Sequence, residues 1–196
     1  MISIERLIRN LSEPDGVIRC NALFSLKELR EEAKPALAAI KRFLRNSSDP
    51  YLQIIAAGAI AAIDRSDPEA VPVLIAALND SKPAHRAWAC EFLGERRHKS
   101  GVLCLMKLFN DESFTVRFEA AKAYGLTFGN WLHAIGICLE MLKDEDDTNR
   151  FIGAENLLGI KQHIQNDLDV VAMAVSTASW ESRIDLEEVL NQLRSK

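Results

Sequence analysis

The sequence lacks any apolar run long enough to cross a membrane and any segment typical of a secretory leader. Its longest apolar stretch, Ile54 to Ile63, has about half of the roughly 20 residues that a membrane-spanning helix needs. The first residues do not form a basic stretch followed by a long apolar one. These absences predict a cytoplasmic protein that does not insert into a membrane.

Cysteine and histidine are few and scattered. The four cysteines include no Cys-x-x-Cys pair, and no histidine lies three or four residues from a cysteine or from another histidine. Zinc sites normally need such spacings, and small disulfide frameworks need regular ones. The sequence therefore predicts no metal, no cofactor, and thiols that stay reduced in the cytosol.

Catalytic motifs and a strong positive charge are also missing. There is no Gly-rich phosphate loop, no Gly-x-Ser-x-Gly and no His-Glu-x-x-His. Residues 1–98 carry 14 Lys and Arg against 13 Asp and Glu, whereas residues 99–196 carry 10 against 15. Because nucleic-acid binding depends on clustered cations, this balance disfavours a nucleic-acid partner and favours a basic one. We expect a protein that is not an enzyme.

What the sequence does contain is an internal repeat. An acidic or proline-containing turn precedes an arginine, and a small residue follows the arginine three positions later. The second unit has glutamine in place of the arginine. This arginine column consists of Arg19, Gln53, Arg86, Arg117, Arg150 and Arg183, at intervals of 34, 33, 31, 33 and 33 residues. A period of this length predicts a stack of repeated units, each of which contacts only its neighbours.

Each interval contains two helical patterns. Before the turn, large apolar residues recur at helical spacing, as in Val71, Leu74, Ile75 and Leu78; after it, small and apolar residues recur, as in Ala89, Cys90 and Leu93. Small residues on the second helices allow close packing of their backbones. Glycines fall near the ends of these second patterns, where a left-handed closing residue is expected: Gly94, Gly125 and Gly159.

The segment from Asp111 to Gly125 reads Asp-x-x-x-x-Val-Arg-x-x-Ala-Ala-x-Ala-Tyr-Gly, which resembles the HEAT-repeat consensus, especially the short variant of phycobilin lyase subunits. The resemblance covers nearly the whole chain and departs from the consensus at Gln53, at Gly153 and in an eroded last unit. It implies an all-α fold, a right-handed α-solenoid of about six helical hairpins. A single array over residues 1–196 is expected, with repeats near 1–33, 34–66, 67–98, 99–128, 129–163 and 164–196.

In the HEAT family, aspartate and arginine columns hydrogen-bond between adjacent turns and form a ladder along the solenoid. The resemblance therefore implies a structural role for the arginine column, in place of phosphate binding. The implied ladder residues are Arg19, Asp80, Arg86, Asp111, Arg117, Asp144 and Arg150.

In a HEAT-like stack the second helices line the concave face, and the positions just after the arginine column project into it. Large apolar groups alternate with carboxylates at these positions, a composition typical of an interaction surface. The competing interpretation is that a tightly curved stack buries the rings. The predicted partner-binding residues are Ile55, Trp88, Glu91, Phe118, Glu119, Lys122, Phe151, Ile152 and Glu155.

The sequence thus predicts a non-enzymatic scaffold that binds a protein or peptide, such as an assembly adaptor or a toxin-neutralising immunity protein. The fold alone leaves two other functions open. One is an enzyme subunit similar to phycobilin lyases. The other is a DNA-binding protein similar to HEAT-like DNA glycosylases, which would need a basic groove where this chain has Glu91, Glu119 and Glu155.

Overall fold

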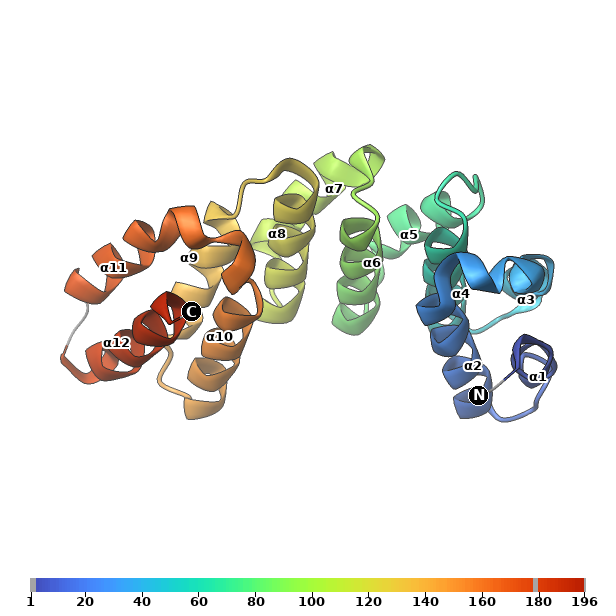
Figure 1. Ribbon diagram of the computed structural model, residues 1–196, viewed down its shortest axis with the longest axis horizontal. Helices are drawn as coiled ribbons and strands as arrows, with labels where there is room; N and C mark the ends of the chain where they lie inside the picture. Colours follow the sequence, from blue (N-terminus) through green and yellow to red (C-terminus); the bar gives the residue numbers. More distant parts are fainter. Residues whose placement is uncertain (1–2, 178–179, 196) are drawn as a thin grey trace.

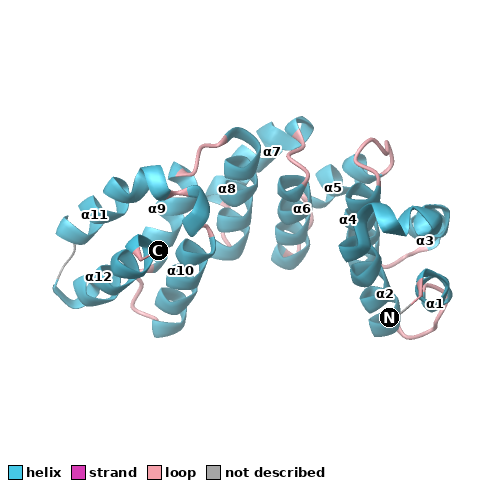
Figure 2. Cartoon of the chain, in the orientation of Figure 1, coloured by secondary structure: helices cyan, strands magenta, loops and turns pink. Residues whose placement is uncertain are grey.

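A computed structural model describes residues 3–177 and 180–195, and within these ranges the chain forms helices joined by short loops, with no β-strand (Figure 2). The all-α fold is therefore confirmed. The first helices of the successive pairs are α1 (Ile4–Asn10), α3 (Leu37–Asn46), α5 (Ala70–Ala77), α7 (Val102–Lys107), α9 (Leu132–Met141) and α11 (Leu168–Thr177). The second helices are α2 (Gly16–Leu29), α4 (Pro50–Ile63), α6 (Pro83–Glu95), α8 (Phe114–Phe128), α10 (Asp147–Gly159) and α12 (Trp180–Arg194).

The repeated turn determines where several of the second helices begin. The side chains of Asp15, Asp49 and Asp146 each accept a hydrogen bond from the backbone N–H two residues later, which caps α2, α4 and α10. Pro50 and Pro83 occupy the first positions of α4 and α6, where a fixed φ and a missing N–H cost nothing. The turn chemistry seen in the sequence thus produces the local structure.

The helices follow one another along the longest axis of an arched array, with α1 and α2 at one end and α11 and α12 at the other (Figure 1). The second helices pack against one another in sequence, α2 on α4, α4 on α6, and α6 on α8. The first helices pack beside them, α3 on α4, α5 against both α4 and α6, and α7 on α8. This is the layer-by-layer arrangement of an α-solenoid.

Glycine allows the second helices to approach closely. A Cβ atom on Gly58 would lie 2.5 Å from the ring of Phe92, and one on Gly94 would lie 2.6 Å from the Cα of Ala123. A Cβ on Gly125 would likewise lie 2.6 Å from the indole ring of Trp131. The prediction that Gly94, Gly125 and Gly159 are left-handed closing residues is wrong, because none of the three has a positive φ. Gly94 and Gly125 are instead needed for close packing.

The interior is divided into two apolar clusters. The first extends from Leu7 to Ala123, and the second extends from Phe118 to Leu193. Helix α8 contributes to both, because its two sides face different neighbours. The candidate sites described below lie at different positions along this divided array.

Among the described residues, no helix has both the length and the apolar character needed to cross a membrane.

Candidate functional site

The residues of the arginine column bind the turn that precedes them. In each unit whose side chains are described, the side chain donates to the carbonyl oxygen six residues earlier. The donors Arg19 Nη1, Gln53 Nε2, Arg86 Nη1, Arg117 Nη1 and Arg150 Nη1 lie 2.7, 2.7, 2.9, 2.9 and 3.0 Å from these oxygens. Each bond satisfies a carbonyl group that the turn leaves without a helical partner. Glutamine does this as well as arginine, which explains why Gln53 is tolerated.

One arginine also joins two adjacent turns. Arg86 donates from Nε and Nη2 to the two carboxylate oxygens of Asp111, each at 2.8 Å, and both side chains are largely buried. The pair has the bidentate geometry that gives arginine–carboxylate bonds their strength. Although burial raises the pKa of Asp111, the bond to Arg86 and the backbone N–H of Ser113 outweigh it, so the pKa lies below its ordinary value.

The other implied rungs differ from this one. Asp80 lies opposite Gln53, and its carboxylate lies 3.0 Å from Nδ1 of His85 instead. Arg117 does not bond to Asp144; its Nη2 lies 3.3 Å from Glu140, and its guanidinium lies 3.9 Å from the ring centroid of Phe114. The expectation of a continuous ladder is therefore wrong among the described residues, because Asp80 contacts His85 and Arg117 contacts Glu140 and Phe114 instead.

The residues that stand six positions before the arginine column explain why Arg19 makes no bidentate bond to the described residues of the next turn. Six residues before each arginine-column residue stand Glu13, Ser47, Asp80, Asp111 and Asp144. Arg19 would need a carboxylate at position 47, and serine stands there. Sequence comparison of the units could have found this serine, but its consequence depends on the geometry of the turns.

The predicted partner-binding residues do not form one surface. Ile55 is fully buried and Phe118 is 4% exposed, so their assignment to an exposed face is wrong. Ile55 is enclosed within the first apolar cluster and Phe118 within the second. The remaining residues fall into two groups, one on α6 and α8 and the other on α10.

The first group surrounds carboxylates on α6 and α8, and we name Glu91, Glu95 and Glu119 the α6–α8 acidic cluster. Lys122 pairs with Glu119 at 2.8 Å. Burial, together with the nearby charge of Glu119, raises the pKa of Glu91 above its ordinary value. A cation placed beside a carboxylate with a raised pKa stabilises its charged form.

Two further residues flank the α6–α8 acidic cluster. Lys27 on α2 pairs with Glu95 at 3.0 Å. Trp88 is half-buried, and its ring centroid lies 5.4 Å from that of Phe24 and 5.5 Å from that of Phe92. Trp88 is thus held in place by neighbouring rings and keeps part of its surface exposed.

The second group lies at a pocket between α10 and α12, with a volume of about 360 Å³. Phe151 is 66% exposed, Ile152 is 38% exposed, and Glu155 is also exposed. The lining of this α10–α12 pocket combines apolar groups with carboxylates: Leu142, Asp147, Arg150, Phe151, Ala154, Glu155, Leu158, Glu188, Val189 and Gln192. Asp147 is already paired with Arg150. Glu155 and Glu188 therefore supply acidic groups at an apolar opening.

Among the described side chains, no group of three or more His, Cys, Asp or Glu is placed to hold a metal ion.

Three similar chains are among those found by comparison with solved structures. Among solved structures, the complex of CpcE and CpcF of phycocyanin lyase from Nostoc sp. PCC7120 is 17% identical, with a TM-score of 0.51 over 98% of this chain and 95% of that chain. A designed armadillo repeat protein is 15% identical, with a TM-score of 0.49 over 98% of this chain and 100% of its own. An engineered protein is 20% identical, with a TM-score of 0.49 over 99% and 97%.

No curated protein sequence matches. The family model for HEAT repeats matches residues 4–81, 37–125 and 71–158, which together span most of the chain. The paired helices, the repeated turn and this match lead to one conclusion: the chain belongs to the HEAT-repeat family.

Proposed function

We propose that this protein is a non-enzymatic scaffold that binds a basic, amphipathic segment of a partner protein. The exposed ring of Phe151 at the α10–α12 pocket is the observation on which the proposal depends. Phe151 is 66% exposed and the adjacent Ile152 is 38% exposed, and exposed apolar groups gathered beside a pocket with a polar rim are typical of an interaction site. A pocket of about 360 Å³ beside the ring has room for one apolar side chain of the partner.

The carboxylates favour a basic segment. Glu155 and Glu188 line the same pocket as Phe151, so lysine or arginine residues next to the inserted apolar residue would meet opposite charge. Asp147 and Arg150 pair with each other and contribute little net charge. Charge selects the partner here, and the apolar contact supplies most of the affinity.

The α6–α8 acidic cluster supports the same preference at a second position. The raised pKa of Glu91 reports a carboxylate that is partly desolvated and close to Glu119. A lysine or arginine of the partner beside Glu91 would relieve both effects. An assembly adaptor and a toxin-neutralising protein both need such a surface, and the identity of the selected partner distinguishes them.

Selection from a displayed peptide library tests the proposal. The bait is the whole chain, and two variants serve for counter-selection, Phe151→Ser and Glu155→Lys. The control is Leu103→Ser, because Leu103 on α7 is 72% exposed and lies outside the pocket. We expect selected peptides to combine an apolar residue with flanking Lys or Arg, and to lose about tenfold or more in affinity for both pocket variants but not for the control. Acidic peptides, or equal binding to all four proteins, would contradict the proposal.

A further inference from the structure

A second pocket, with a volume of about 380 Å³, lies at the other end of the array, between the α1–α2 turn and the α3–α4 turn. We infer that it is a binding site for a carboxylate of a partner peptide, and that the guanidinium of Arg19 is the group that binds it. The inference does not depend on the proposed function, because the two pockets share no residue and the occupants have opposite charge.

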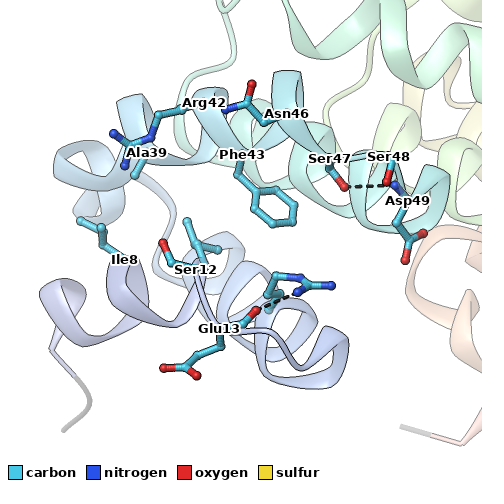
Figure 3. A pocket seen from close by; sticks show the side chains of 12 residues that line it. Ile8, Ser12, Glu13, Ala39, Arg42, Phe43, Asn46, Ser47, Ser48 and Asp49 are labelled. Atoms are coloured by element: carbon cyan, nitrogen blue, oxygen red, sulfur yellow. Dashed lines mark hydrogen bonds between the residues drawn. The ribbon is translucent and has the colours of Figure 1, made fainter.

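The pocket combines an apolar wall with one oriented cation. Figure 3 shows the ring of Phe43 on α3 pointing toward Ser12 and the turn that follows α1. Ile8 and Leu11 on the α1 side complete the apolar wall. The carboxylate of Glu13 points away from Phe43 in the same view (Figure 3). Arg19 lines the pocket and has part of its surface exposed.

Arg19 is bound to its turn as Arg86 is. Its Nη1 donates to the carbonyl oxygens of Glu13 and Pro14 at 2.7 and 2.8 Å. The Nη1 of Arg86 makes the equivalent bonds to Asp80 and Ser81 at 2.9 and 3.1 Å. In both residues these bonds leave the edge formed by Nε and Nη2 without a bond to the residue's own turn. Arg86 uses this edge to bind Asp111, whereas the same edge of Arg19 has no acceptor among the described residues.

Ser47 stands where a bidentate acceptor would be needed. Asp80, Asp111 and Asp144 each accept a hydrogen bond from the backbone N–H two residues later, at 2.8 to 2.9 Å. Ser47 Oγ makes the equivalent bond to the N–H of Asp49 at 3.3 Å. Position 47 thus keeps the turn contact but supplies a hydroxyl in place of a carboxylate. The group that completes a rung at Asp111 is absent at this turn, and the pocket lies in its place.

Arg19 is the cation that faces an incoming carboxylate. Arg42 on α3 also lines the pocket, but its guanidinium points away from Phe43 (Figure 3). Asp49 also lines the pocket, but its carboxylate is occupied with the N–H groups of Tyr51 and Leu52, which it caps at the start of α4. A planar carboxylate matches the fork of an arginine edge, and the apolar wall favours an occupant with an apolar group beside its charge.

A titration monitored by NMR tests the inference. The signal is the Nε–Hε cross-peak of Arg19, which is identified by its loss in Arg19→Gln. N-acetyl-leucine represents a chain terminus, and N-acetyl-aspartic acid amide represents an acidic side chain. We expect at least one of them to saturate the signal, and the tighter of the two identifies the source. N-acetyl-leucinamide, which lacks the charge, should bind about tenfold or more weakly. Inorganic phosphate should bind less tightly than the better carboxylate.

Two variants complete the test. Arg19→Gln should fold normally, because Gln53 makes the same turn bond at 2.7 Å, and neither carboxylate should then shift the backbone amide signals of the residues that line the pocket, whereas the tighter one should shift them in the wild type. Ser47→Asp should complete the rung with Arg19, raise the melting temperature and prevent saturation by either carboxylate. Undiminished binding to Ser47→Asp, equal binding of N-acetyl-leucinamide, tighter binding of phosphate, or no saturation by either carboxylate would each overturn the inference.

Discussion

Replacing Gly94 by alanine should destabilise the protein, although alanine is the better helix former. A Cβ at this position would lie 2.6 Å from the Cα of Ala123 and 2.7 Å from its Cβ, so α6 and α8 would have to separate. Overpacking of this kind costs about 1–3 kcal/mol, and the gain in helix propensity returns about 1 kcal/mol. We expect a net loss of up to about 2 kcal/mol. The matched control is Gly136→Ala on α9, where a Cβ would meet nothing within 4 Å and the same substitution should stabilise by about 0.5–1 kcal/mol.

Urea denaturation followed by circular dichroism measures both changes under one set of conditions. The two variants should have midpoints on opposite sides of the wild-type value. A further arm combines Gly94→Ala with Ala123→Gly, which removes the contact to the Cβ but not the one to the backbone, so it should restore part of the loss. If Gly94→Ala stabilises as much as Gly136→Ala does, the packing argument for the second helices fails.

Three other predictions concern buried polar groups. Arg86→Met leaves the carboxylate of Asp111 buried without its partner and should cost about 3–5 kcal/mol in chemical denaturation, about 2 kcal/mol more than Arg117→Met, whose carboxylate partner is 60% exposed. The raised pKa of Glu91 means that its contribution to stability is present at acid pH and is lost as pH rises through that pKa, so Glu91→Gln should gain stability relative to wild type as the pH rises from acid values through the raised pKa. Burial raises the pKa of the thiols of Cys90 and Cys138, that of Cys138 to about 12. Mass-mapped alkylation of the native protein should therefore be slower at these two thiols than at Cys20 and Cys104, which are only partly buried.

The repeat and the helices could be predicted from the sequence because they depend on short-range patterns. A helical period and a capping residue act within a few positions. The bond from Arg19 to its own turn also spans only six residues, but the prediction from the sequence assigns the arginine column a role between turns instead. The all-α class and the membership of the HEAT family follow from the repetition of these local features.

Exposure and pairing between turns could not be predicted in the same way, because they depend on how closely neighbouring helices pack. Ile55 and Ile152 occupy the same place in their units, two residues after the arginine-column residue, yet one is fully buried and the other is 38% exposed. The close contact of Gly58 with Phe92 belongs to the part of the array that encloses Ile55. Arg86 reaches Asp111 but Arg117 does not reach Asp144, a difference that no residue type reveals.

Helix α8 is shared by both halves of the interior. Ala120 and Ala123 belong to the first apolar cluster, while Phe118 and Ala121 belong to the second. A substitution in α1 or α12 changes the packing of one apolar cluster, whereas a substitution in α8 changes the packing of both clusters. Modular arrays are often shortened, extended or recombined by engineering, since each unit contacts only its neighbours. In this protein, units can be joined or removed with least disturbance away from α8. A cut at α8 would expose apolar faces of both clusters at once.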